Sequence, residues 1–141
     1  MIKGFFGVNI AVNDLEAATA KYEALLGVPA QQAKSEDFAF PGIVGVGFEF
    51  HGVLISLLSS KDQGNPVGAF LKKKGEGIIL ISVKADDIEN DIEALRKKGL
   101  SFLMPEVFSG PFGKVNFIPP KTMHGVQVEV IQPAGRLEGG R

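Results

Sequence analysis

The side chains that most often carry out chemistry in proteins are few in this sequence. It contains no cysteine and only two histidines, His51 and His124. Disulfides, thiolate zinc sites, iron–sulfur clusters, cysteine nucleophiles and sites built from several imidazoles are therefore excluded. Each histidine stands directly before a glycine, Gly52 or Gly125, in a pattern typical of turns with unusual backbone angles. We interpret both histidines as turn residues rather than as ligands or catalysts.

One acidic residue, Glu129, stands where it could act on a small molecule. It lies between Gln127 and Ile131 on one face of a predicted strand. If its surroundings are partly dry, burial raises its pKa and makes the carboxyl a usable general acid or base. The alternative is a structural carboxylate that only accepts hydrogen bonds. The donors for that alternative are Asn9, Ser56, Ser82 and Gln127.

Alternating and helical spacings of apolar residues divide the chain into strands and helices. Strands are predicted at residues 7–12, 42–50, 53–58, 78–83, 100–104, 114–118 and 126–131. Asn13 and Asp86 are predicted to cap two helices that end before Gly27 and Gly99. A further short helix is predicted around residues 67–73.

The second half of the sequence repeats the first with a spacing of 73 residues. Residues 51–57 (HGVLISL) correspond to residues 124–130 (HGVQVEV), and the helix starts at Asp14 and Asp87 have the same spacing. Agreement at two separated places indicates a tandem duplication of a strand–helix–strand–strand–strand unit. We expect a first module at residues 1–60, a linker at 61–76, a second module at 77–133 and a flexible tail at 134–141.

The branched apolar residues of the strands fall on one face, which helices are expected to cover. The other face mixes polar and apolar residues. Either it is wetted by solvent, or a twisted sheet of about eight strands curls and this face becomes a cup for a small molecule. We favour the cup. Its predicted lining is Asn9, Leu54, Ser56, Leu80, Ser82, Phe117, Gln127 and Glu129.

Charge and hydropathy bear on the partners and the compartment. The 141 residues carry a formal net charge of −1, which gives no electrostatic reason to expect nucleic acid or an anionic membrane as partner. The longest apolar run, residues 78–83, is too short to span a bilayer, and no signal-peptide core is found. We therefore expect a cytoplasmic protein.

Three segments together resemble the vicinal oxygen chelate superfamily. They are VNIAVNDLEAATAKYEALLGV, ISVKADDIENDIEALRKKGL and VNFIPPKTMHGVQVEVIQP, and the likeness extends over about residues 4–133. This group includes glyoxalase I, methylmalonyl-CoA epimerase, extradiol dioxygenases and bleomycin-resistance proteins, and the epimerase and glyoxalase-like branch is the most similar. The resemblance implies an α+β fold, in which tandem βαβββ modules form a cup-shaped mixed sheet with helices on the convex face. It also implies a homodimer.

The resemblance further implies a divalent metal held by one ligand from each of four strands. These four positions fall on Gly7, Ser56, Leu80 and Glu129. Only Glu129 is a competent ligand, since Gly7 and Leu80 offer no donor and a serine hydroxyl binds such metals weakly. We therefore expect neither a metal site nor a cofactor.

Two functions remain open at this stage. The first is a protein that binds a small organic molecule in the cup without a metal, by sequestration or as an accessory protein. The alternative is a metal-independent isomerase, epimerase or lyase acting on a thioester or 2-oxo substrate, with Glu129 as general acid or base. The epimerase branch also implies a second acid, in the region where Glu36 and Asp37 lie.

Overall fold

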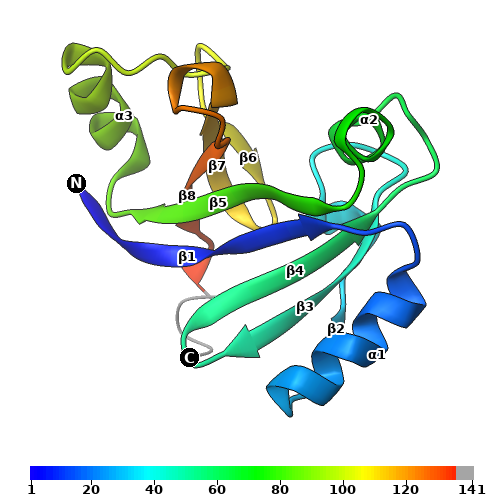
Figure 1. The fold of residues 1–141 in the computed structure, drawn as a ribbon. Helices are drawn as coiled ribbons and strands as arrows, with labels where there is room; N and C mark the ends of the chain where they lie inside the picture. Colours follow the sequence, from blue (N-terminus) through cyan, green and yellow to red (C-terminus); the bar gives the residue numbers. More distant parts are fainter. Residues whose placement is uncertain (136–141) are drawn as a thin grey trace. The chain divides into compact units, whose positions relative to one another are not determined.

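The structure is a computed structural model that describes residues 1–135 (Figure 1). Two segments of the described residues form single turns of 3₁₀ helix, namely η1 (Ser35–Asp37) and η2 (Pro120–Thr122). The strands are β1 (Ile2–Ala11), β2 (Gln31–Gln32), β3 (Val44–Phe50), β4 (Val53–Ser59), β5 (Gly77–Ala85), β6 (Phe108–Gly110), β7 (Gly113–Ile118) and β8 (Val128–Pro133). The helices are α1 (Leu15–Leu26), α2 (Pro66–Lys74) and α3 (Ile88–Lys97).

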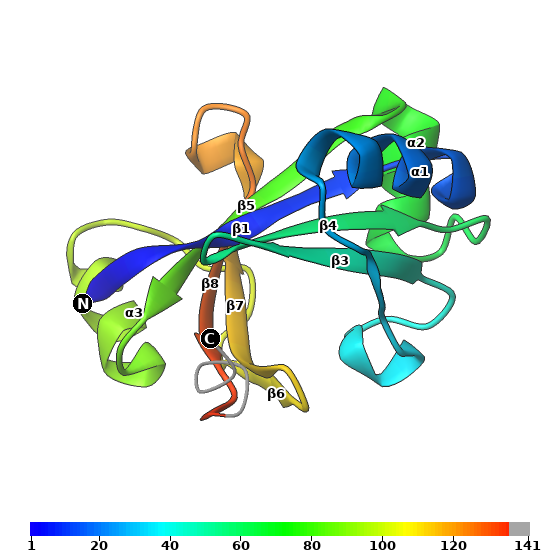
Figure 2. The same ribbon diagram turned by 90° about the horizontal axis from the view of Figure 1, so that it is seen from below.

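The chain forms two compact units. The N-terminal unit is Gly7–Ile79, and the C-terminal unit combines Met1–Phe6 with the chain from Leu80 onward. The strands of the N-terminal unit follow the order β2-β3-β4-β1, and those of the C-terminal unit the order β5-β8-β7-β6 (Figures 1 and 2). Each unit thus has the order strand, helix, strand, strand, strand along the chain, which confirms the predicted α+β class and the paired βαβββ modules.

In the N-terminal unit, helices pack on both faces of the strands. The apolar side of α1 covers the face predicted from the branched residues, where Val12, Val46, Phe48 and Leu57 are buried. Helix α2 instead packs Val67 against residues of the opposite face, and these include Ala11 and Leu58. Asn65 caps α2 by accepting a hydrogen bond from the Gly68 N–H at 2.9 Å. The short helix predicted in the linker is therefore confirmed, and it closes one end of the mixed face.

In the C-terminal unit, α3 covers the face that carries Val83, Ala85 and Val130. These residues pack with Ile88 and Ile92 of the helix. The alternation of a strand then places Ser82, Lys84 and Glu129 on the opposite face. The core of this unit thus lies between α3 and one face of its strands. The polar residues of these strands lie on the other face, which α3 does not cover.

The strand registers confirm the 73-residue repeat. In the N-terminal unit β1 runs parallel to β4, with Asn9 opposite Ser56. In the C-terminal unit β5 runs parallel to β8, with Ser82 opposite Glu129, and each residue of this pair lies 73 positions after its counterpart. The two His–Gly turns agree as well, because His51 and His124 have positive φ angles of 50° and 56°. Both histidines are exposed, and their assignment as turn residues is confirmed.

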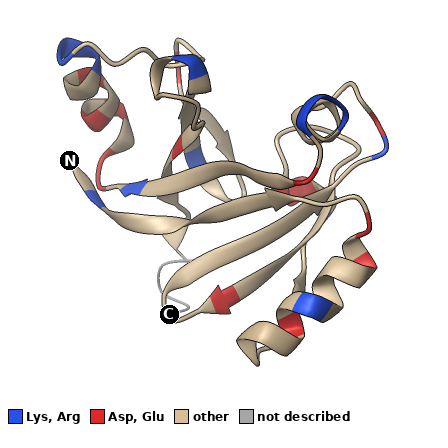
Figure 3. Cartoon of the chain, in the orientation of Figure 1, with Lys and Arg blue, Asp and Glu red and all other residues tan. Residues whose placement is uncertain are grey.

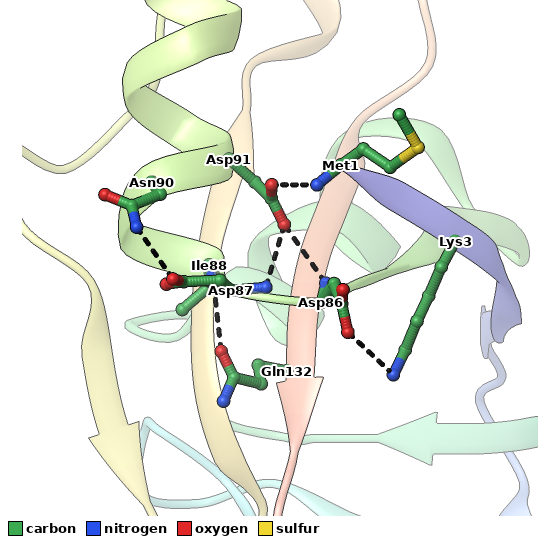
Figure 4. A network of polar contacts seen from close by, with 8 residues as sticks. All are labelled: Met1, Lys3, Asp86, Asp87, Ile88, Asn90, Asp91 and Gln132. Carbon is green, nitrogen blue, oxygen red and sulfur yellow. Dashed lines mark hydrogen bonds and ion pairs between the residues drawn. The ribbon is translucent and has the colours of Figure 1, made fainter.

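The first turn of α3 is fixed by a network that the sequence did not predict (Figure 4). Asp86 was expected to cap this helix, but the N-cap is Asp87 and its side chain makes no capping hydrogen bond. The buried Asp91 carboxylate instead accepts hydrogen bonds from the Asp86 and Asp87 N–H groups, both at 3.0 Å, and pairs with the Met1 amino group. Gln132 accepts from the Ile88 N–H at 2.9 Å. Side chains outside the cap position therefore bind the first N–H group of this helix and the two N–H groups that precede it.

Two further local predictions were wrong. Asp14, not Asn13, caps α1 by accepting from the Ala17 N–H at 3.0 Å. No strand forms at residues 100–104, and the strand in that part of the chain is β6. The fully buried Asn116 side chain of β7 binds both backbone polar groups of Met104, at 3.2 and 3.0 Å, and takes the place of a regular ladder between this segment and β7. The tail was predicted at 134–141. Of these residues the structure describes only Ala134 and Gly135, and 136–141 lie outside the described residues.

Candidate functional site

The predicted site residues of the C-terminal unit meet across three strands. Ser82 of β5 is opposite Glu129 of β8, and Glu129 is opposite Phe117 of β7. The Ser82 hydroxyl donates a hydrogen bond to Oε1 of Glu129 at 2.7 Å. Ser82 is buried and Glu129 is partly buried. The structure thus brings together an acid, a hydroxyl donor and an aromatic ring on the face opposite α3.

The environment of Glu129 changes its acidity. Burial raises the pKa of the Glu129 carboxyl above its ordinary value of 4.5, and the hydrogen bond from Ser82 acts in the opposite direction. A carboxyl with a raised pKa accepts a proton more strongly, when ionised, than a solvated carboxyl does. It also keeps its proton up to a higher pH. A pKa shift in this direction is the one that a carboxyl acting as a general acid or base requires.

The other predicted residues of this unit lie on β5 and just before β8. Leu80 is buried on β5, two positions before Ser82. Gln127 lies just before β8, where its carbonyl accepts from the Ile81 N–H at 3.1 Å. Lys84, two positions after Ser82 on β5, also falls on this face and was not selected from the sequence. The strict alternation of residues 80, 82 and 84 was the signal that could have found it.

The N-terminal unit carries the remaining three predicted residues. Asn9 lies opposite Ser56, and Leu54 lies opposite Gly7, all on β1 and β4. Asn9, Leu54 and Ser56 are all partly exposed. They form a second row of paired positions with no ionisable group. The eight predicted residues therefore form two groups, one in each unit.

Two hollows occur elsewhere in the units. A hollow of about 300 Å³ lies in the C-terminal unit beside α3, lined by Glu89, Ile92, Arg96, Pro105, Glu106, Val107 and Asn116. A second, of about 610 Å³, lies in the N-terminal unit at the start of α1, lined by Asn13, Asp14, Leu15, Gly42, Val44, Ser59, Ser60 and Lys61. Neither includes any of the eight predicted site residues.

Comparison with known protein families identifies the superfamily of this chain. Residues 7–118 match the Glyoxalase/Bleomycin resistance protein/Dioxygenase superfamily. The chain belongs to this superfamily. Among its curated members, the mitochondrial methylmalonyl-CoA epimerase of Homo sapiens is 35% identical over 127 residues, covering 89% of this chain and 71% of the relative. The ethylmalonyl-CoA/methylmalonyl-CoA epimerase of Cereibacter sphaeroides is 34% identical over 128 residues, covering 89% and 94%.

A solved structure of the superfamily shows the same fold. It is a Streptomyces coelicolor methylmalonyl-CoA epimerase variant in complex with 2-nitronate-propionyl-CoA. It matches with a TM-score of 0.84 and 26% sequence identity, covering 95% of this chain and 96% of the other. The resemblance inferred from the sequence, including the epimerase branch, is therefore confirmed.

The four metal-ligand positions implied by the superfamily do not suit a divalent ion in this chain. A side chain at Gly7 would collide with the backbone carbonyl oxygen of Leu54, so this position cannot present a ligand without moving a strand. Leu80 has no donor atom. Ser56 supplies only a neutral hydroxyl, which leaves Glu129 as the single anionic donor. Among residues 1–135, no three acidic, histidine or cysteine side chains are grouped as a metal site would require.

The second acid implied by the epimerase branch is not buried in the structure. Glu36 is exposed in η1, and Asp37 accepts a hydrogen bond from the Lys34 N–H at 2.9 Å within the same turn.

Within residues 1–135, no helix is long and apolar enough to cross a membrane.

Proposed function

We propose that this protein removes and returns the proton next to the carbonyl of a small CoA thioester, the proton transfer on which epimerase chemistry depends, with Glu129 as the acid and base on one face of the α-carbon and without a divalent metal. The observation that carries the proposal is the partly buried Glu129 carboxyl, whose Oε1 accepts the Ser82 hydroxyl. The epimerase relatives support the substrate class. The donor chemistry at Gly7, Ser56 and Leu80 supports the absence of a metal.

The Ser82 hydrogen bond orients the carboxyl for this role. Because Oε1 is occupied, Oε2 is the oxygen that takes the α-proton, and the electron pair of the C–H bond moves into the enolate of the thioester. The reverse step returns a proton from Oε2 to the α-carbon. Ser82 has one hydroxyl proton, and Glu129 already accepts it, so Ser82 does not also stabilise the enolate oxygen. We assign that role to the side-chain amide of Gln127, the other polar donor predicted for this unit.

Proton exchange with solvent is the direct measure of what Glu129 does. A single carboxyl returns the proton to the face that it left, so inversion needs a second donor, whereas exchange does not. Methylmalonyl-CoA incubated with the protein in D₂O should gain deuterium at the α-carbon, followed by mass spectrometry. Glu129→Gln should slow this exchange by about 100-fold or more, the usual contribution of general acid–base catalysis.

Two controls sharpen this experiment. Glu93→Gln removes an exposed carboxyl of α3 in the same unit and should leave the exchange rate unchanged. A metal chelator should also leave it unchanged. Exchange in Glu129→Gln at the rate of the unmodified protein would refute the mechanism. Loss of exchange with chelator and recovery with a divalent ion would refute metal independence.

The second candidate function is binding without turnover, in the cytoplasm and as a homodimer, as a sequestering or accessory protein. It is favoured by the two superfamily ligand positions that have no donor atom, Gly7 and Leu80. Calorimetric titration with methylmalonyl-CoA separates the two functions. Saturable binding with no deuterium gain would assign this second function and exclude the epimerase.

A further inference from the structure

Lys84 lies in an unusual place for a cation. Most charged residues lie on helices and connecting segments, and the strands carry few (Figure 3). The strands hold three cations among the described residues, namely Lys3, Lys84 and Lys114. Lys3 pairs with Asp86 at 3.3 Å and Lys114 with Glu89 at 2.9 Å. Within residues 1–135, Lys84 is therefore the one strand cation that pairs with no carboxylate.

The contacts of Lys84 show which face of β5 it occupies. Its neighbours Val83 and Ala85 pack with the cluster under α3. Lys84 therefore falls on the face opposite α3, and its Nζ lies 5.9 Å from the centre of the Phe6 ring. Phe6 is buried and belongs to the same C-terminal unit. A ring face at this distance attracts the ammonium but accepts no conventional hydrogen bond, so the ammonium protons remain available to an anionic acceptor.

The ammonium of Lys84 and the carboxyl of Glu129 share this face without forming an ion pair. Ser82 is opposite Glu129, and Lys84 is opposite Ile131, one step of two residues further along the same strands. Such a step spans about 7 Å. Ile131 and its β7 partner Val115 are both buried and apolar. The face therefore offers an acid and a cation separated by a short apolar stretch.

We infer that Lys84 binds the free carboxylate of the substrate, so that the site selects malonyl-type thioesters over neutral acyl thioesters. This inference rests on the proposed function of the same face. A charge-assisted hydrogen bond and an α-carbon in position for proton transfer each need about 3 Å. Together with the short step from a malonyl carboxylate to its α-carbon, they fit a two-residue step along these strands, from the Ser82–Glu129 pair to the Lys84–Ile131 pair. Lys84 is a specificity-determining residue in this arrangement.

A pair of thioesters that differ only in the carboxylate tests this inference. Calorimetry should show that the protein binds methylmalonyl-CoA about 10- to 100-fold more tightly than propionyl-CoA, the usual contribution of a hydrogen bond to a charged group. Lys84→Met keeps an unbranched side chain near Phe6 and removes the charge. It should abolish this preference and leave the affinity for propionyl-CoA unchanged. Lys84→Arg should restore most of it.

The matched control is Lys114→Met, which removes a strand cation on the opposite face and should retain the full preference. An undiminished preference in Lys84→Met would overturn the inference, as would an equal loss in Lys114→Met. Deuterium exchange separates this result from the proposed function. If the preference depends on Lys84 but no exchange occurs, carboxylate recognition stands and the epimerase falls. If exchange occurs and the preference does not depend on Lys84, only this inference falls, and if neither thioester binds, both fall.

Discussion

The two units have the same strand register and different chemistry at the paired positions. In the N-terminal unit the pair is Asn9 and Ser56, two neutral side chains. In the C-terminal unit the equivalent pair is Ser82 and Glu129, joined by a hydrogen bond of 2.7 Å. The duplication therefore preserved the backbone while the side chains at the same register diverged. Only the C-terminal unit has an ionisable group in this row, so the acid–base chemistry we propose belongs to that unit.

The starts of the two main helices differ in the same way. Asp14 caps α1 from the N-cap position with one hydrogen bond and stays exposed. Asp91, on the first turn of α3, is buried and accepts from two backbone N–H groups and the Met1 amino group. The C-terminal helix is thus held by a carboxylate that also ties the start of the chain to it.

The largest expected effect on stability comes from removing these two carboxylates. Asp91→Ala should lower the free energy of unfolding by about 3 kcal/mol, because two backbone N–H groups and the Met1 amino group lose a buried carboxylate as their partner. Asp14→Ala should cost about 1 kcal/mol, the usual loss for an exposed N-cap. Urea unfolding followed by circular dichroism measures both. Equal losses would show that the two helix starts are energetically alike.

A second comparison concerns glycines of β1. A methyl group at Gly7 would collide with the Leu54 carbonyl oxygen, whereas one at Gly4 meets nothing within 4 Å. Gly7→Ala should therefore lower the free energy of unfolding by about 1–3 kcal/mol through steric strain. Gly4→Ala should change it by less than about 0.5 kcal/mol. A neutral Gly7→Ala in thermal unfolding would show that β1 and β4 can separate at little cost.

The smallest effect is the dependence of stability on pH. The folded pKa of Glu129 lies above 4.5, so the folded state binds more protons and the free energy of unfolding should fall as pH rises through and above 4.5. Burial opposes ionisation of Asp91, but hydrogen bonds from the Met1 amino group and from the Asp87 and Asp86 N–H groups lower its pKa below 3.8. Its contribution is therefore present above 3.8 and is lost as pH falls below that value.

Two variants separate these opposite slopes. Glu129→Gln should flatten the decline above pH 4.5, and Asp91→Asn should reduce the loss below pH 3.8. Unfolding curves at a series of pH values report both. A decline above pH 4.5 that persists in Glu129→Gln would assign it to another group.

The sequence predicted the strand register that the two modules share. It did not predict the helix cap and the local structure that depend on contacts between residues distant in sequence. The 73-residue spacing placed Ser82 opposite Glu129 correctly, because register is fixed by alternation and by the turns. The cap of α3 was missed because its acceptor, Asp91, is not at the cap position and is defined by where Met1 lies. The strand at residues 100–104 was wrong because this segment is joined to β7 by the Asn116 side chain and by a single backbone hydrogen bond, from the Leu103 N–H to the Phe117 carbonyl at 2.7 Å, and not by a ladder. Lys84 was missed because the predicted strand ended at residue 83, whereas β5 continues to Ala85, so the alternation of residues 80, 82 and 84 was not followed to its end.

The contact between Gly7 and Leu54 has a consequence for the history of such a chain. Recovering a metal-binding side chain on β1 would take more than one codon change, since the new atoms would overlap the neighbouring strand. Substitution at Gly7 alone would first lower stability, and only a further change in β4 would relieve it. Once the ligand at this position is lost, it is therefore harder to regain than it was to lose. Later substitutions are then more readily accepted when they favour chemistry that does not need the ion.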